Sequence, residues 1–332
     1  MVNFNHMDGD VNVVVIGGGT GSFAVLSGLK KYCKHITALV SMADDGGSTG
    51  MLRDELGVLP PGDVRQCLVA LSNSPKLRDL FNYRFDEGSL AGHSFGNLFL
   101  TALQKTTGSF ADAVDTASKL LDTGGHRVVP ITLDQVTLVA DDGERVIRHE
   151  REIREADFLN ARPKVWLDPT PTPNPVALEA IRDADLIVIA PGGLYESLGA
   201  SLVVPGIGRA LAESRAKKLY VCNLMNQERH TKDFTVVDFA DELERLAGCE
   251  FLDEVLYNSN YPNNEIVARY ALEGEHPVLS SKAKRHYARR GVDLLSGTIW
   301  QNNSKKDPIA HQRALIRHDV DKLAKNILKN LA

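Results

Sequence analysis

The amino-acid sequence predicts an α/β fold, namely a doubly wound, Rossmann-like and mostly parallel sheet with a small β-rich insertion. Short apolar runs rich in β-branched residues alternate with helical patterns near both ends of the chain, which is typical of β-α-β units. Several of these runs end in glycine-rich loops. Between the two regions, alternating segments flank an Asp-Gly turn, which indicates a β-hairpin.

The N-terminal region contains the first of these units. The apolar run 11–16 ends in the glycine turn 17–21, and a helix is expected over 24–31. A second apolar run, 36–42, ends in the loop 43–50. Strand, glycine turn, helix, strand is the opening order of a doubly wound, nucleotide-binding sheet.

The middle of the chain is expected to be helical and then to change character. The hairpin signal places a β-hairpin insertion at 127–160. The remaining chain divides into a flexible tail, 1–10, and a nucleotide-ligand-binding core formed by 11–126 and 161–332. Three helices are expected in the first part of this core, over 64–73, 95–105 and 110–121.

The α/β pattern resumes after four alternating prolines. Asn174 is a good N-cap for a helix that begins at Pro175, because its side chain can accept a free backbone N–H and proline needs no partner there. Residues 320–331 carry an apolar stripe at helical spacing, which favours a core-packing helix. Strands are expected over 186–190, 219–223 and 251–258.

Composition excludes several classes of function. The chain has 332 residues, of which 43% are hydrophobic and 24% charged, with a formal net charge of −5, as in an ordinary globular protein. Acids and bases are interspersed, so no nucleic-acid partner is expected. No apolar run reaches the roughly 18–20 residues of a membrane span, and the four dispersed cysteines form no zinc motif. We expect a cytoplasmic protein.

Ligands of open α/β sheets bind outside the carboxyl ends of the strands, and the first such end is the glycine turn. Glycines let the backbone approach a phosphate, and the helix that follows offers free N–H groups. The match to the dinucleotide fingerprint is imperfect because Ser22 occupies its sixth position. A plain tight turn is the alternative. The candidate residues are Gly17, Gly18, Gly19, Thr20 and Gly21.

The second strand end carries paired carboxylates. They could accept hydrogen bonds from sugar hydroxyls, or hold Mg²⁺, the one cofactor that the sequence leaves open. A solvated turn is the alternative. No other metal site is expected. The candidate residues are Asp44, Asp45, Gly46, Gly47 and Ser48.

Further candidates follow the next loops. Asp63 stands three residues before Gln66, so a capping box and a ligand contact are both open. Arg53 and Arg65 are candidate clamps for phosphate, or else surface salt-bridge partners. Ser94 is a natural N-cap, with Asn97 in the first turn. Later loops add Gly192, Gly193, Tyr195 and Asn223.

Six blocks of the sequence resemble the YvcK branch of the YvcK/CofD family. They occur in family order over nearly the whole chain, and the longest is far more specific than the glycine turn alone. The blocks are GGGTG (17–21), MADDGGSTGMLRDELGVLPPGDVRQCLVAL (42–71), AGHSFGNLFLTAL (91–103), PGGLYESLGASLVVPGI (191–207), YVCNLMNQ (220–227) and RHDVDKLA (317–324).

The resemblance implies a bacterial gluconeogenesis factor that binds UDP-activated sugars such as UDP-N-acetylglucosamine. Such proteins are needed for cell shape and wall synthesis on gluconeogenic carbon sources. The CofD relatives instead transfer 2-phospho-L-lactate from a guanosine diphosphate-linked donor to a deazaflavin precursor, with Mg²⁺. By resemblance, Tyr270 and Arg317 are further candidates for contact with a nucleotide sugar.

Two departures favour the regulatory branch. The loop 44–48 reads Asp-Asp-Gly-Gly-Ser where the transferases typically show Asp-Thr-Gly-Gly-Asp, and Gly193 replaces a serine. A non-catalytic nucleotide-sugar sensor is therefore the leading hypothesis, and a 2-phospho-L-lactate transferase is the alternative. A nicotinamide dehydrogenase is disfavoured by the imperfect fingerprint. A protein partner of the sensor is expected, and a homodimer is left open.

Overall fold

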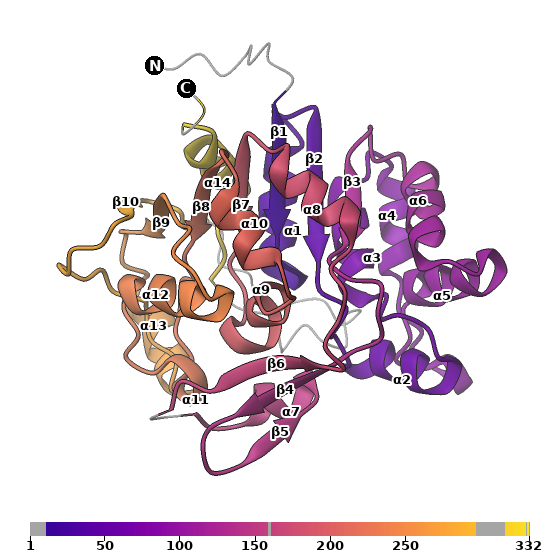
Figure 1. Ribbon diagram of the computed structural model, residues 1–332, viewed down its shortest axis with the longest axis horizontal. Helices are drawn as coiled ribbons and strands as arrows, with labels where there is room; N and C mark the ends of the chain where they lie inside the picture. The colour runs from indigo at the N-terminus through magenta and orange to yellow at the C-terminus, as the bar shows by residue number, and fades with distance from the viewer. Residues whose placement is uncertain (1–10, 159–160, 297–315, 330, 332) are drawn as a thin grey trace.

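The computed structural model describes residues 11–158, 161–296, 316–329 and 331. The expected tail 1–10 lies outside the described residues. The main sheet has seven strands in the order β10-β9-β8-β7-β1-β2-β3, and every pair in it is parallel (Figure 1). Its strands are β1 (Asn12–Ile16), β2 (His35–Val40), β3 (Arg127–Pro130), β7 (Leu186–Ile189), β8 (Lys217–Val221), β9 (Glu254–Asn258) and β10 (Ala288–Val292).

This strand order confirms the doubly wound fold. The chain runs outward from β1 to β2 and β3, and then returns to place β7 on the other side of β1. Val13 of β1 is paired with Ile36 of β2 and with Leu186 of β7. The direction of winding therefore reverses between β1 and β7, which is the topological switch point of such sheets.

Two apolar layers explain why the central strands are continuous hydrophobic runs. Successive side chains of a strand point to opposite faces, so Val14 and Ile16 pack in one core cluster and Val13 and Val15 in the other. All four are at most 2% exposed. Helices α1, α3 and α14 contribute to one cluster and α8, α10 and α12 to the other, so the sheet is covered on both faces.

The helices that the sequence predicts are present, with further ones between them. No helix in the described part of the chain is both long and apolar enough to cross a membrane. The α-helices are α1 (Gly19–Leu29), α2 (Gly47–Leu56), α3 (Gly62–Leu71), α4 (Pro75–Asn82), α5 (Phe95–Thr107), α6 (Phe110–Leu120), α7 (Glu150–Glu155), α8 (Pro175–Arg182), α9 (Ala200–Leu202), α10 (Ile207–Glu213), α11 (Glu228–Thr231), α12 (Val236–Ala247), α13 (Asn264–Ala271) and α14 (Val320–Leu328).

The insertion is a separate antiparallel sheet of three strands in the order β5-β4-β6. The hairpin lies where the Asp-Gly turn predicts it, between β4 (Thr137–Asp141) and β5 (Val146–Arg148). Its limits differ from the expected 127–160, because β3 pairs with β2 in the main sheet and β6 (Lys164–Asp168) pairs with β4. Figure 1 shows this small sheet and α7 beneath the carboxyl ends of the main strands.

Candidate functional site

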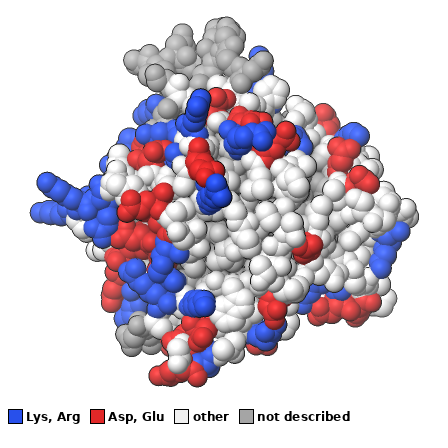
Figure 2. Space-filling view, in the orientation of Figure 1, with Lys and Arg blue, Asp and Glu red and all other residues white. Residues whose placement is uncertain are grey.

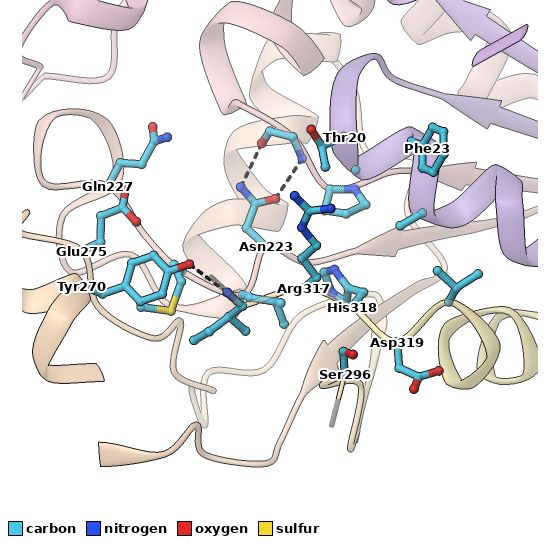
Figure 3. Close-up of a pocket in the computed structure, with 18 of the residues that line it drawn as sticks. Thr20, Phe23, Asn223, Gln227, Tyr270, Glu275, Ser296, Arg317, His318 and Asp319 are labelled. Carbon is cyan, nitrogen blue, oxygen red and sulfur yellow. Dashed lines mark hydrogen bonds between the residues drawn. The ribbon is translucent and has the colours of Figure 1, made fainter. Parts of the chain in front are cut away.

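A cavity of about 950 Å³ opens at the topological switch point. Its wall combines the start of α1 with the loops after β7 and β8, and with residues from α13 and the segment before α14 (Figure 3). The lining residues used below are Thr20, Gly21, Gly192, Asn223, Tyr270, Arg317 and His318. We call this cavity the switch-point pocket.

The glycine turn lets the loops after β1 and β7 touch. Gly17 and Gly19 have φ values of +142° and +65°, which other residues rarely adopt. A Cβ on Gly21 would lie 1.8 Å from the Pro191 carbonyl oxygen, so a side chain cannot be placed there without moving the backbone. The first turn of α1 therefore stands directly against the β7 loop, with its N-terminal amides at the pocket.

Asn223 fixes the β7 loop from the neighbouring strand. Its Oδ1 accepts a hydrogen bond from the Gly192 amide at 3.1 Å, and its Nδ2 donates to the Gly192 carbonyl at 2.8 Å (Figure 3). Both polar atoms of the Asn223 side chain are thus hydrogen-bonded to the backbone of Gly192. Asn223 holds the wall of the pocket in place.

Tyr270 and the segment carrying Arg317 contribute to the opposite wall. The buried Tyr270 hydroxyl accepts a hydrogen bond of 3.0 Å from the Ile316 amide, which ties α13 to the segment carrying Arg317. In Figure 3 the Arg317 guanidinium extends toward Asn223 and Thr20. A cation therefore faces the amides at the start of α1 across the pocket, which is an arrangement suited to an anionic ligand.

His318 is a pocket residue that the sequence analysis did not single out. It is 9% exposed, and burial lowers its pKa to about 4, although a hydrogen bond with the Cys222 backbone opposes the shift. The imidazole is therefore neutral at physiological pH. A lone histidine gives no local pattern, and only its position beside Arg317 in the 317–324 block could have indicated it.

Asp45 does not line the switch-point pocket; it anchors the insertion. Its carboxylate accepts hydrogen bonds of 3.0 Å from the backbone amides of Glu150 and Arg151, at the first turn of α7. His149 Nδ1 also lies 3.0 Å from this carboxylate. A residue after β2 therefore acts as the cap of a helix more than 100 positions later in the chain. Arg53 stands behind it, with Nη1 3.7 Å from Asp45 Oδ2.

Asp63 enters the glycine turn. Helix α3 begins at Gly62 with Pro61 as its N-cap, so the capping box with Gln66 is not formed. Instead, Asp63 Oδ1 accepts a hydrogen bond of 3.0 Å from the Gly19 amide, and a Cβ on Gly18 would lie 1.8 Å from Asp63 Oδ2. Burial, with the nearby Asp44 charge as the second cause, raises the Asp63 pKa to about 7.

Asp44 belongs to an acidic cluster beside the glycine turn. Burial raises its pKa, while a 3.0 Å hydrogen bond from the Gly46 amide favours the ionised form. Glu150 of α7 is 5% exposed, and burial raises its pKa to about 8. Its ion-pair partner Arg154 is the cation of this cluster. No local sequence pattern indicates Glu150 and Arg154 as site residues, because they come from the insertion, far from Asp44 in the chain.

This cluster bears on the open question of Mg²⁺. The described residues include no group of three or more His, Cys, Asp or Glu side chains placed to hold a metal ion. Asp44 and Asp63 offer oxygen ligands of the type that Mg²⁺ prefers. They do not by themselves make a complete set of ligands for Mg²⁺.

A third group of predicted residues forms a buried network between α2, α3 and α5. The Arg65 side chain donates a hydrogen bond to Asn97 Oδ1 at 3.0 Å, and the side-chain nitrogen Nδ2 of Asn97 donates to Ser48 Oγ at 3.3 Å. Ser94 caps α5, as predicted, by accepting a hydrogen bond from the Asn97 backbone. Gly47 begins α2 with a φ of +45°. These residues lie together, but they are not part of the switch-point pocket wall.

Tyr195 and Gly193 lie under the β7 loop. Tyr195 is fully buried, with its ring centroid 5.6 Å from that of Phe158, and it does not line the switch-point pocket. A Cβ on Gly193 would lie 2.0 Å from Glu196 Oε1. Glycine at position 193 therefore leaves room for the buried Glu196 carboxylate.

The geometry defines a class: a doubly wound α/β protein with an anion-suited pocket at its switch point. Comparisons agree with this class. A family model described as 2-phospho-L-lactate transferase CofD matches residues 13–300. A relative from Thermotoga maritima is 44% identical over 318 residues, which are 95% of this chain and 97% of that protein. The gluconeogenesis factor of Bacillus subtilis is 39% identical over 317 residues, or 94% of this chain and 95% of that protein.

A solved structure is also similar. The crystal structure of a upf0052 family protein from Bacillus halodurans has a TM-score of 0.85 and 36% identity, and the match covers 96% of this chain and 99% of that one. The chain belongs to the CofD family. The resemblance that the sequence blocks indicate is therefore confirmed.

Proposed function

We propose that the switch-point pocket binds a nucleotide sugar of the UDP-N-acetylglucosamine type. The observation that carries this proposal is the convergence of the α1 N-terminus, the Gly192 loop and Arg317 on one cavity. Backbone amides at a helix start and a guanidinium are the donors that a diphosphate uses. Thr20, Gly21 and Arg317 would hold the diphosphate, and Tyr270 would border the nucleoside or the sugar.

The size and walls of the pocket support this assignment. About 950 Å³ is the upper part of the range typical of small-molecule sites, which run from roughly 300 to 1,000 Å³. Phe23, Leu224 and Met225 add apolar surface to the polar donors. A base can pack on such surface while the diphosphate and sugar hydroxyls meet the polar groups.

The protein would act as a cytoplasmic regulatory protein, a gluconeogenesis factor needed for cell shape and wall morphogenesis on gluconeogenic carbon sources. The Bacillus subtilis relative carries the name gluconeogenesis factor. The side chain of Asn223, which is fully engaged in holding the pocket wall, supports binding without turnover. Occupancy would be read by a protein partner.

A 2-phospho-L-lactate transferase acting on a deazaflavin acceptor is the second candidate. It is favoured by the description of the matching family model and by the carboxylates of Asp44 and Asp63 beside the glycine turn. In such a reaction Mg²⁺ would neutralise charge on the phosphoryl group. The hydroxyl of the acceptor would need a base, and Asp63, with its pKa near neutrality, is the group to supply it.

The two candidates are separated by the fate of the ligand. The protein is incubated with UDP-N-acetylglucosamine, with and without Mg²⁺, and the ligand is recovered and analysed. Intact ligand after binding supports the sensor. In parallel, the protein is given a guanosine diphosphate-linked 2-phospho-L-lactate donor, Mg²⁺ and a deazaflavin acceptor. Transfer in that assay, lost in Asp63→Asn, would establish the transferase instead.

A further inference from the structure

A second cavity, of about 370 Å³, lies at the outer edge of the sheet. It is formed by the end of β9, the loop that precedes β10, and β10 itself. No described residue lines both this cavity and the switch-point pocket. We call it the edge cavity, and its lining residues are Tyr257, Ser280, Ser281, Lys284, Arg285, Tyr287 and Arg289.

The described lining of the edge cavity consists of cationic and hydroxyl-bearing side chains. Three of the seven side chains are cations and the other four carry hydroxyl groups, and none of these described residues is acidic or aliphatic. Every one of them can donate a hydrogen bond. A cavity lined by donors and positive charge is complementary to a compact oxyanion with several acceptor oxygens.

Part of the wall is fixed by Asp241 of α12. Arg285 donates to its carboxylate from Nε at 2.9 Å and from Nη2 at 2.6 Å, and the buried Tyr287 hydroxyl donates to the same carboxylate at 2.7 Å. Asp241 therefore balances the charge of Arg285. It also orients two donors without entering the cavity lining.

With Arg285 paired to Asp241, Lys284 and Arg289 are the two lining cations that give the edge cavity its positive charge. Arg289 lies in β10, where backbone pairing places it opposite Val255, and its Nη1 donates to the Ser281 carbonyl. This carbonyl is a neutral partner, and Arg289 forms no ion pair with another residue in the described part of the chain. Lys284 forms no ion pair with any residue in the described ranges. Figure 2 shows cationic side chains projecting from this edge of the molecule, over the loop before β10.

We propose that the edge cavity binds a phosphomonoester, with Lys284 and Arg289 as its charge contacts and the serine hydroxyls as further donors. A phosphate group fits within a volume of about 370 Å³ with room for part of the group to which it is attached. The phosphomonoester could belong to a small metabolite or to a phosphorylated side chain of a partner protein. Both present the same dianion.

The test is a titration of the ¹⁵N-labelled full chain with inorganic phosphate at low ionic strength, followed by two-dimensional NMR. The spectra locate the anion directly, so phosphate bound at the switch-point pocket is resolved separately and the outcome does not depend on the proposed function. The variants are Lys284→Glu, Arg289→Gln and the matched control Lys282→Glu. Lys282 is an exposed lysine two positions away that does not line the cavity.

We expect saturable shifts of the amides of residues 280–289 in the wild type and in Lys282→Glu. Lys284→Glu and Arg289→Gln should each weaken this binding about tenfold, a loss of about 1.4 kcal/mol. Shifts elsewhere only, or equal weakening by Lys282→Glu and Lys284→Glu, would overturn the proposal. Repeating the titration with glucose 6-phosphate and with a phosphoserine peptide identifies the source, because the natural type of ligand should bind more tightly than free phosphate.

Discussion

The carboxylate of Asp63 accepts a hydrogen bond of 3.0 Å from the backbone amide of Gly19, so part of the glycine turn is occupied by the protein's own anion. In the proposed function, a ligand phosphate would thereby be directed toward Thr20 and Gly21, on the side of the turn that faces the switch-point pocket. The same contact puts an acidic group of raised pKa beside the first turn of α1.

The raised pKa of Asp63 predicts a pH dependence of stability. Its pKa is about 7 in the folded protein, against about 3.9 for an unfolded aspartate, so the folded state binds the extra proton in this interval. The free energy of unfolding should therefore contain a contribution that falls as pH rises from about 4 to about 7. Asp63→Asn should remove on the order of 4 kcal/mol of this change, because a pKa difference of about 3 corresponds to that free energy.

Urea unfolding at several pH values measures this effect. Asp86→Asn, a change of an exposed aspartate, is the control and should follow the wild type. The assigned pKa would be contradicted if the free energy of unfolding changed with pH in the same way in the wild type and in Asp63→Asn over this interval.

For His318, the expected dependence of the free energy of unfolding on pH has the opposite sign. Its pKa is about 4 in the folded protein, against about 6.5 when unfolded, so the unfolded state binds more protons between these values. The free energy of unfolding should therefore rise with pH from about 4 to about 6.5 through this group. His318→Asn should flatten the rise by on the order of 3 kcal/mol, whereas His276→Asn, at an exposed position, should not.

Substitution by alanine is expected to cost different amounts of stability at Gly21 and at Gly19. A Cβ at Gly21 meets the Pro191 carbonyl oxygen at 1.8 Å, so Gly21→Ala must displace backbone and should cost about 3 kcal/mol. At Gly19 the space is open and only the φ of +65° opposes a side chain, so Gly19→Ala should cost about 1 kcal/mol. Chemical denaturation of both variants checks the order, and equal costs would argue against the close approach.

Removal of the Asp45 carboxylate is expected to have a local effect on the stability of the insertion. Asp45→Ala removes the acceptor for the Glu150 and Arg151 amides and should destabilise α7 by about 1–2 kcal/mol. Hydrogen exchange of residues 150–155 should become faster, while exchange in β7 stays unchanged. Asp54→Ala, at an exposed site two turns into α2, should leave α7 protected. Unchanged exchange in α7 after Asp45→Ala would show that the cap contributes nothing.

Much of the fold could be predicted from the sequence because its signals are local. Buried parallel strands such as β1 and β7 are continuous apolar runs, and the Asp-Gly turn marks the β4–β5 hairpin. The strand β10 was missed because it is a sheet edge with two arginines in five residues and no apolar run. The boundary at 127 was misplaced because β3 is a short edge strand, and only its pairing with β2 assigns it to the main sheet.

The site was predicted less completely, because its contacts join distant parts of the chain. The spacing of Asp63 and Gln66 fits a capping box, yet α3 begins at Gly62, so Asp63 is free to reach Gly19. Nothing local indicates that Asp45 caps α7. The place of Tyr270 in the pocket wall depends on a bond to Ile316, 46 residues away.

The most direct test of the account is calorimetric titration of the full chain with UDP-N-acetylglucosamine, using the wild type, Arg317→Ala and Arg209→Ala. Arg209 is an exposed arginine of α10, paired with Glu213 and outside the pocket lining, and serves as the matched control. We predict micromolar-range binding by the wild type and Arg209→Ala, and binding at least about tenfold weaker by Arg317→Ala. No binding by the wild type, or equal affinity in all three proteins, would contradict the assignment of the switch-point pocket as a nucleotide-sugar site.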